Sequence, residues 1–179
     1  VWGSLGAAHM NEIMADFIVR ACANPFFSLI HSAGKGGYKG MVETLEKEKP
    51  DYRERGMDVR DYIYDMPRVM AAADLVLCRA GASTLAELTA MGKPAVLIPS
   101  PNVTNNHQER NARVLEDAGG AQVLLEGEFT ADSLLGLVSE LLHRPERPEA
   151  MSKAMKTLAV ADSTERIASL VLSLAGKGK

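Results

Sequence analysis

Short apolar runs alternate with longer amphipathic segments along the whole chain. The runs predict a first strand ending at residues 1–2, and further strands at 26–31, 57–63, 75–78, 95–98 and 121–125. Apolar positions at helical spacing predict helices after residue 7 and at 38–49, 65–73, 83–91, 104–118, 130–141, 151–158 and 163–174. Runs that are apolar throughout and separated by helices are typical of a parallel sheet covered on both faces. The pattern therefore predicts an α/β fold, with residues 1–179 as one domain around a doubly wound parallel sheet.

Composition and charge narrow the class of protein. The chain has 179 residues, 24% of them charged, and a net charge of −3 with few aromatic residues, so nothing indicates a nucleic-acid partner. The four histidines, at positions 9, 31, 107 and 143, have no metal-ligand spacing, and we expect neither a metal nor a cofactor. Cys22 and Cys78 are expected to be small buried residues in a reducing compartment.

The candidate chemistry lies between Cys78 and Asn111. Ligands of parallel sheets bind at the carboxyl ends of the strands, and the loops after Cys78 and after Ile98 both fall there. In the first loop, Gly81 and Ala82 would let a ligand approach the backbone, and a helix beginning at Ser83 or Thr84 would present free N–H groups to a phosphate.

Glu87 has two interpretations. Its carboxylate could accept hydrogen bonds from two adjacent hydroxyls, as on a ribose. The segment Thr84-Leu85-Ala86-Glu87 also matches a capping box, in which the glutamate binds the start of its own helix, and spacing alone favours this second interpretation.

The second loop leads to polar residues at helical spacing. His107 lies four positions before Asn111 and Gln108 lies three positions before it, so the three side chains share one part of the helix surface. They could bind sugar hydroxyls, but an ordinary solvated helix face is the simpler interpretation.

Two more glycine loops follow predicted strands. The loop Gly3-Ser4-Leu5-Gly6-Ala7 could hold phosphate or could be a structural turn, and the sequence favours neither. The loop at 34–37 contains lysine but lacks the Walker A spacing, so an exposed flexible loop is favoured there. His31, at the end of its strand, is interpreted as a structural histidine.

Several ordered motifs together resemble one family. RAGA-x-T-x-AEL at 79–88, G-x-PA-x-LIP at 92–99 and HQ-x-x-NA at 107–112, with GSLGA at 3–7, Asn11 and DYIYDM at 61–66, are similar to the C-terminal half of the MurG family. These are bacterial transferases that move N-acetylglucosamine onto lipid I to make lipid II for peptidoglycan. Trp2 and Ala8 depart from the family pattern, in which glycine and arginine are usual at these positions.

The resemblance implies a Rossmann-like donor-binding half of a GT-B glycosyltransferase, with the acceptor half preceding Val1. It implies UDP-N-acetylglucosamine as donor, lipid I as acceptor through the other half, and a place on the cytoplasmic face of the cell membrane through that half. The general base would belong to the other half, so no catalytic residue is expected here. The implied donor-binding residues, from the uracil to the sugar, are Ser4, Gly6, Ile63, Ala82, Ser83, Thr84, Leu85, Ala86, Glu87, His107, Gln108 and Asn111.

Three alternatives to this function remain open. A related transferase could use another acceptor, as diacylglycerol galactosyltransferases do, or a naturally detached donor subunit could work with a separate partner. A protein of this fold could also bind nucleotide sugars without catalysis. Arg79, directly before the first loop, would either contact phosphate or form a structural ion pair.

Overall fold

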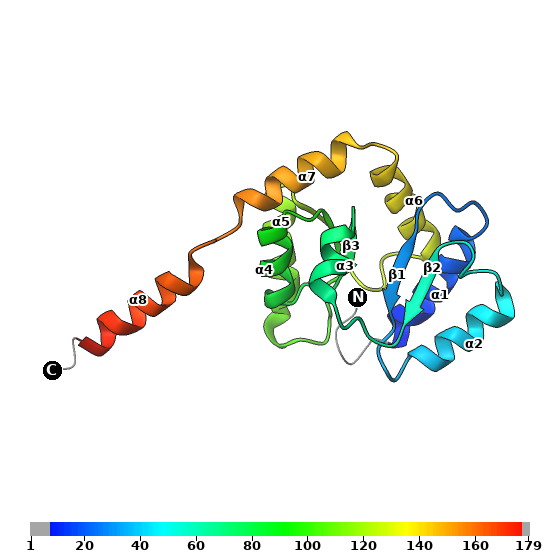
Figure 1. The fold of residues 1–179 in the computed structure, drawn as a ribbon, viewed down its shortest axis with the longest axis horizontal. Coiled ribbons are helices and arrows are strands. Elements are labelled where there is room, and N and C mark those ends of the chain that lie inside the picture. The colour runs from blue at the N-terminus through cyan, green and yellow to red at the C-terminus, as the bar shows by residue number, and fades with distance from the viewer. Residues whose placement is uncertain (1–7, 177–179) are drawn as a thin grey trace.

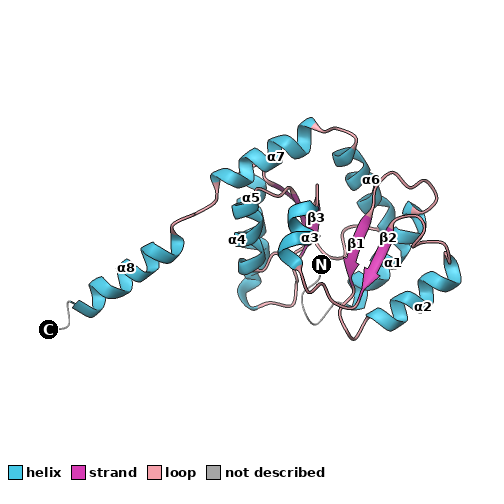
Figure 2. Ribbon diagram, in the orientation of Figure 1, coloured by secondary structure: helices cyan, strands magenta, loops and turns pink. Residues whose placement is uncertain are grey.

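The computed structural model describes residues 8–176, in which helices alternate with short parallel strands (Figures 1 and 2). The predicted elements are present there with shifted ends. β1 begins at residue 29 rather than 26, β2 and β5 end early at residues 60 and 123, and α7 begins at residue 146 rather than 151. The first predicted strand, at residues 1–2, lies outside the described residues. In chain order, the elements are α1 (Ala8–Ala21), β1 (Leu29–Ser32), α2 (Tyr38–Glu48), β2 (Met57–Arg60), α3 (Met66–Ala72), β3 (Val76–Cys78), α4 (Ala82–Met91), β4 (Ala95–Leu97), the 3-10 turn η1 (Thr104–Asn106), α5 (His107–Asp117), β5 (Ala121–Val123), α6 (Ala131–Leu142), α7 (Glu146–Thr157) and α8 (Ser163–Gly176).

The described strands are all parallel, and they form two sheets. β1 pairs with β2, with Leu29 opposite Met57. β4 lies between β3 and β5, with Ala95 opposite both Val76 and Ala121. The predicted parallel α/β class is therefore confirmed, and residues 8–176 present it as a pair of sheets.

The central strand β4 is apolar throughout because both of its faces are buried. On β4, Val96 and the following Ile98 belong to a core that also holds side chains of α1, α2 and α6. The alternating residues Ala95 and Leu97 belong to a second core, formed with α3, α4 and α5. Since successive side chains of a strand point to opposite faces, this division shows helices covering both sides, as a doubly wound fold requires.

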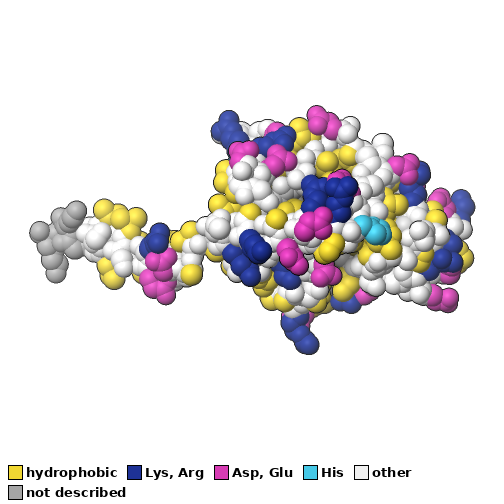
Figure 3. Space-filling view, turned by 90° about the horizontal axis from the view of Figure 1, so that it is seen from above, with side chains coloured by type: hydrophobic (Ala, Val, Ile, Leu, Met, Phe, Trp, Pro, Cys, Tyr) yellow, Lys and Arg dark blue, Asp and Glu magenta, His cyan; other side chains and the backbone are white. Residues whose placement is uncertain are grey.

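Helix α8 lies apart from the two cores. It extends away from the body of the molecule (Figure 1), and apolar side chains are exposed along it (Figure 3). Ile167, Leu170, Val171 and Leu174 follow helical spacing, yet each is between 58% and 63% exposed. Apolar residues at helical spacing usually mark a packing face. Among the described residues this holds for α6, whose Leu134, Val138 and Leu141 are buried, but not for α8.

We expect Leu170→Glu to leave the free energy of unfolding of this chain within about 0.5 kcal/mol of its original value, because the side chain is already in water. For comparison, Leu141→Ala at a buried leucine of α6 should lower the free energy of unfolding by about 2–5 kcal/mol. Urea denaturation followed by circular dichroism measures both. A loss above about 1 kcal/mol for Leu170→Glu would show that α8 packs against the domain.

Candidate functional site

The amino-terminal tip of α4 is open. β3 ends at Cys78, the chain turns through residues 79–81, and α4 begins at Ala82 with Gly81 as its N-cap in an extended conformation (φ −71°, ψ 141°). No side chain caps this end, and the first amide bonded back into the turn is that of Leu85, which donates to the Gly81 carbonyl at 3.0 Å. The amides of residues 82–84 therefore point outward at the positive end of the helix dipole.

The capping-box interpretation of Glu87 is wrong. It required Thr84 to be the N-cap, but α4 begins two residues earlier, so Thr84 and Glu87 both lie inside the helix. Glu87 is exposed, and among the described residues its carboxylate has no hydrogen bond to the start of the helix. A carboxylate in this position is available to a ligand, about one turn beyond the open amides.

Gln108 reaches back to the loop that follows β4. The backbone N–H of Ser100 donates to Gln108 Oε1 at 3.0 Å, which fixes the side chain across the loop. Its helix, α5, begins only at His107, because Asn105 and Asn106 take positive φ values of 55° and 50° and break the segment that was predicted as one helix from residue 104. The His107 ring lies against its own turn, with Nδ1 3.0 Å from the Thr104 carbonyl oxygen.

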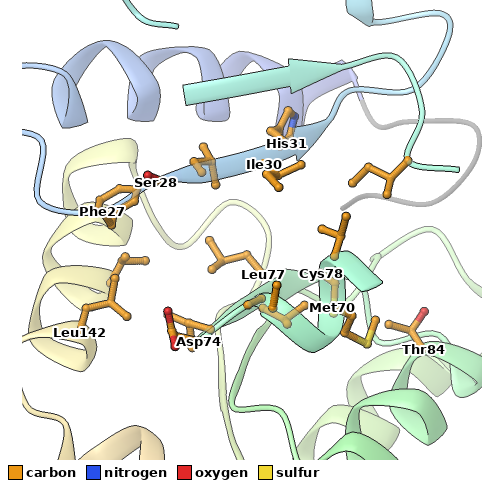
Figure 4. Close-up of a pocket in the computed structure, with 18 of the residues that line it drawn as sticks. Phe27, Ser28, Ile30, His31, Met70, Asp74, Leu77, Cys78, Thr84 and Leu142 are labelled. Carbon is orange, nitrogen blue, oxygen red and sulfur yellow. The ribbon is translucent and has the colours of Figure 1, made fainter. Parts of the chain in front are cut away.

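A cavity of about 1220 Å³, bounded by the described residues, runs along the strands between the two sheets. Figure 4 shows Phe27 and Leu142 at one end of it and Thr84 at the other, beyond the carboxyl end of β3. The predicted site residues that line this cavity are Ile63, Gly81, Thr84, Glu87 and Gln108. They come from the segment after β2, the start of α4 and the start of α5, and the fold brings them together at the carboxyl ends of the strands.

The other predicted site residues do not line the cavity or lie outside the described residues. Ala82, Ser83, Ala86 and His107 are exposed, and Asn111 is half-buried, but none of them lines the cavity. Leu85 is 7% exposed and belongs to the core beneath α4, so only its backbone is open to a ligand. Ser4 and Gly6 lie outside the described residues.

Ile63 follows β2 and lines the cavity, and its side chain is 3% exposed. Tyr62 and Tyr64, on either side, form an exposed edge-to-face aromatic pair with ring centroids 5.0 Å apart. Sequence reasoning did not single out this pair, although two tyrosines flanking one isoleucine at the end of the predicted strand were a visible signal.

Arg79 has a structural ion pair. Its guanidinium donates to the carbonyls of Ile98 and Pro99, both at 3.1 Å, and lies 2.6 Å from Glu126 Oε2. Of the two interpretations from sequence, the structure supports the ion pair. Sequence reasoning missed Glu126, whose signal was a carboxylate directly after the predicted strand at 121–125, at the same sheet edge.

Burial shifts the pKa values of two side chains beneath the site, His31 and Cys78. His31 is 2% exposed, and burial lowers the pKa of its imidazole to about 3. Burial likewise raises the pKa of the Cys78 thiol to about 11, so this cysteine is inert rather than nucleophilic. Cys22 and Cys78 are both free and buried, as expected. Within residues 8–176, no group of His, Cys, Asp and Glu side chains is arranged to hold a metal ion.

Comparison with known proteins gives one consistent answer. Residues 1–167 match the family described as "Glycosyltransferase family 28 C-terminal domain". The chain is 41% identical over 169 residues to the UDP-N-acetylglucosamine--N-acetylmuramyl-(pentapeptide) pyrophosphoryl-undecaprenol N-acetylglucosamine transferase of Acetivibrio thermocellus, an alignment that covers 94% of this chain and 45% of that protein. It is 39% identical over 176 residues to the protein of the same name from Bacillus cytotoxicus, which covers 98% of this chain and 47% of that protein.

The fold agrees with the sequence matches. The crystal structure of Acinetobacter baumannii MurG is similar with a TM-score of 0.79 and 25% identity, over 97% of this chain and 48% of that chain. The resemblance to the MurG family inferred from the motifs is thus confirmed, as is the Rossmann-like GT-B half that it implied. The chain spans about half the length of the curated relatives that it matches.

Proposed function

Because this chain belongs to the family of glycosyltransferase family 28 C-terminal domains, we propose that it is the donor-binding half of a transferase that moves N-acetylglucosamine from UDP to a lipid-linked muramyl sugar. The relatives' names supply the donor and the acceptor, an N-acetylmuramyl-(pentapeptide) pyrophosphoryl-undecaprenol. The observation that carries the proposal is the open tip of α4 with Glu87 one turn further along, beside Gln108 in the same cavity.

Each part of the donor has a matching place in this arrangement. The diphosphate binds the amides of residues 82–84, where the helix dipole favours negative charge. Glu87 accepts hydrogen bonds from the ribose hydroxyls, and the backbone around Ile63 binds the uracil edge. Gln108, with His107 and Asn111 beside it on α5, binds the sugar. Ser4 and Gly6 are assigned to the reacting part of the donor by the motif GSLGA alone.

The chemistry that these residues support is departure of the diphosphate. As the bond between the sugar carbon and the phosphate oxygen breaks, positive charge develops on the sugar and negative charge on UDP. Amides held in place before the reaction stabilise that negative charge without reorganisation. The acceptor hydroxyl attacks the opposite face of the sugar, which inverts its configuration, and the base that takes its proton comes from the remainder of the full-length protein.

The remainder of the full-length protein also determines the cellular location that we propose. Within residues 8–176, no helix has the length and apolar character needed to cross a bilayer. We place the full-length protein on the cytoplasmic face of the membrane, with the lipid-linked acceptor reaching it through the other half.

Calorimetric titration of this chain with UDP-N-acetylglucosamine tests the proposal. We expect weak binding and no turnover, because the donor site is here and the acceptor site is not. No heat at millimolar donor with demonstrably folded protein would count against a preformed donor site. In the full-length protein, transfer from UDP-galactose rather than UDP-N-acetylglucosamine would favour a related transferase with another acceptor.

We expect Gln108→Ala to weaken UDP-N-acetylglucosamine binding about fivefold to tenfold, because one hydrogen bond to an uncharged sugar group contributes about 1 kcal/mol. The affinity for UDP alone should stay unchanged, since Gln108 is assigned to the sugar. Titration of one variant with both ligands separates the two effects. Equal losses for UDP and for the nucleotide sugar would refute the assignment.

A further inference from the structure

One guanidinium joins the carboxyl ends of three neighbouring strands. Arg79 follows β3, its two carbonyl acceptors are Ile98 and Pro99 after β4, and its carboxylate partner Glu126 follows β5. The side chains of Arg79 and Glu126 are only 13% and 15% exposed. The pair is therefore held inside the protein, directly beneath the edge at which the donor is proposed to bind.

The same guanidinium lies between the two walls of the site. Two residues after Arg79 comes Gly81, the N-cap of α4. One residue after Pro99 comes Ser100, whose amide holds Gln108. A shift of Arg79 relative to the β4 end thus changes the separation between the α4 tip and Gln108, even though neither contact touches the donor.

Stability alone gives a weak reason for this pair. Transferring a charged group from water into the protein interior costs roughly several kcal/mol per ion. Replacing a buried ion pair by apolar side chains of similar volume therefore often leaves a protein as stable as before. An apolar replacement cannot form hydrogen bonds, and so it cannot orient the groups around it. The planar guanidinium holds several acceptors at fixed angles, which an aliphatic chain cannot do.

We propose that Arg79 and Glu126 are positioning residues, which fix the spacing between the diphosphate-binding amides of α4 and the sugar-binding Gln108. This inference rests on the proposed function, because it concerns two parts of the same donor. A ligand that spans both parts, a nucleoside diphosphate sugar, requires the spacing. UDP, which occupies only the first part, does not.

The test uses the full-length protein and a double variant, Arg79→Met with Glu126→Leu, that replaces both charges by apolar groups. We expect it to remain folded, with a melting temperature lowered by the loss of the two hydrogen bonds to the Ile98 and Pro99 carbonyls. Its affinity for UDP should change less than about twofold, and its affinity for UDP-N-acetylglucosamine should fall about tenfold, because misplaced binding groups lose much of their effect. Glu126→Gln keeps an acceptor for the guanidinium, and should lose only about threefold for the nucleotide sugar.

The outcomes separate the two proposals. Wild-type protein that binds neither UDP nor UDP-N-acetylglucosamine would end the proposed function, and the positioning role with it. Wild-type protein that binds both, with a double variant that loses both affinities equally or loses neither, would leave the function standing and overturn the positioning role. If the double variant unfolds, Glu126→Gln decides: unchanged affinity for the nucleotide sugar means that the pair is only structural.

Discussion

Replacing Glu87 by alanine is expected to weaken UDP binding by about tenfold to a hundredfold, because each hydrogen bond to a charged group contributes about 1.5–3 kcal/mol and part of this is recovered by water. The loss should be the same for UDP and for UDP-N-acetylglucosamine, since both carry the ribose. Calorimetric titration with each ligand measures it. The reason is the position of the carboxylate, which lines the cavity one turn beyond the open amides of α4 and is not used as a helix cap.

The melting temperature of Glu87→Ala should match that of the original chain, because the side chain is exposed and makes no contact with the helix start. Asp74→Ala is the matched control. Asp74 is an exposed carboxylate that lines the same cavity near Leu142, away from Thr84 (Figure 4). A control that loses as much affinity as Glu87→Ala, or a Glu87→Ala variant that melts lower and binds normally, would contradict the ribose assignment.

Stability is expected to fall by about 2 kcal/mol between pH 7 and pH 5 through His31 alone. Burial lowers the pKa of this imidazole in the folded protein to about 3, well below its ordinary value of 6.5. In the window between these two values the unfolded chain binds a proton that the folded protein does not, so acid favours unfolding. The destabilisation caused by this proton uptake reaches its full size only below the folded pKa of about 3, and it is absent above the unfolded pKa of 6.5.

Urea denaturation at several pH values between 7 and 5 measures this slope. His31→Gln should flatten it, because the variant has no imidazole to protonate in the unfolded chain. His143→Gln is the control, since it removes an exposed histidine whose ring lies 4.6 Å from that of Phe26. If His31→Gln and the original chain lose stability in parallel, His31 is not the group responsible.

The sequence predicted the elements well because a strand that is buried on both faces must be a continuous run of apolar residues. Val96 and Leu97 point to opposite cores, so the whole run of β4 had to be apolar. Helix ends were also visible where the backbone demanded a special residue. Gly92, with φ of 63°, follows the last residue of α4, Met91, which is also where the predicted helix at 83–91 ends.

The site was predicted in parts, and its weakest point was the start of α4. Spacing alone favoured a capping box, because Thr84 and Glu87 have the right residue types three positions apart. A helix start depends on where the preceding strand and loop deliver the chain, and Gly81 takes that position instead. The break at Asn105 and Asn106 has a similar origin, since positive φ values in asparagine leave little trace in periodicity.

By itself, the sequence determined the class of fold, the order of its elements and the two loops that carry the polar residues, because these follow from local spacing and from the need to bury apolar side chains. Only the tertiary structure decided that Glu87 is free of its own helix, that Gln108 is held by Ser100, and that Arg79 joins three strand ends to Glu126. Each of these depends on contacts between segments far apart in the chain. Their geometry is set by the packing of strands and helices, which the local pattern of residues does not record.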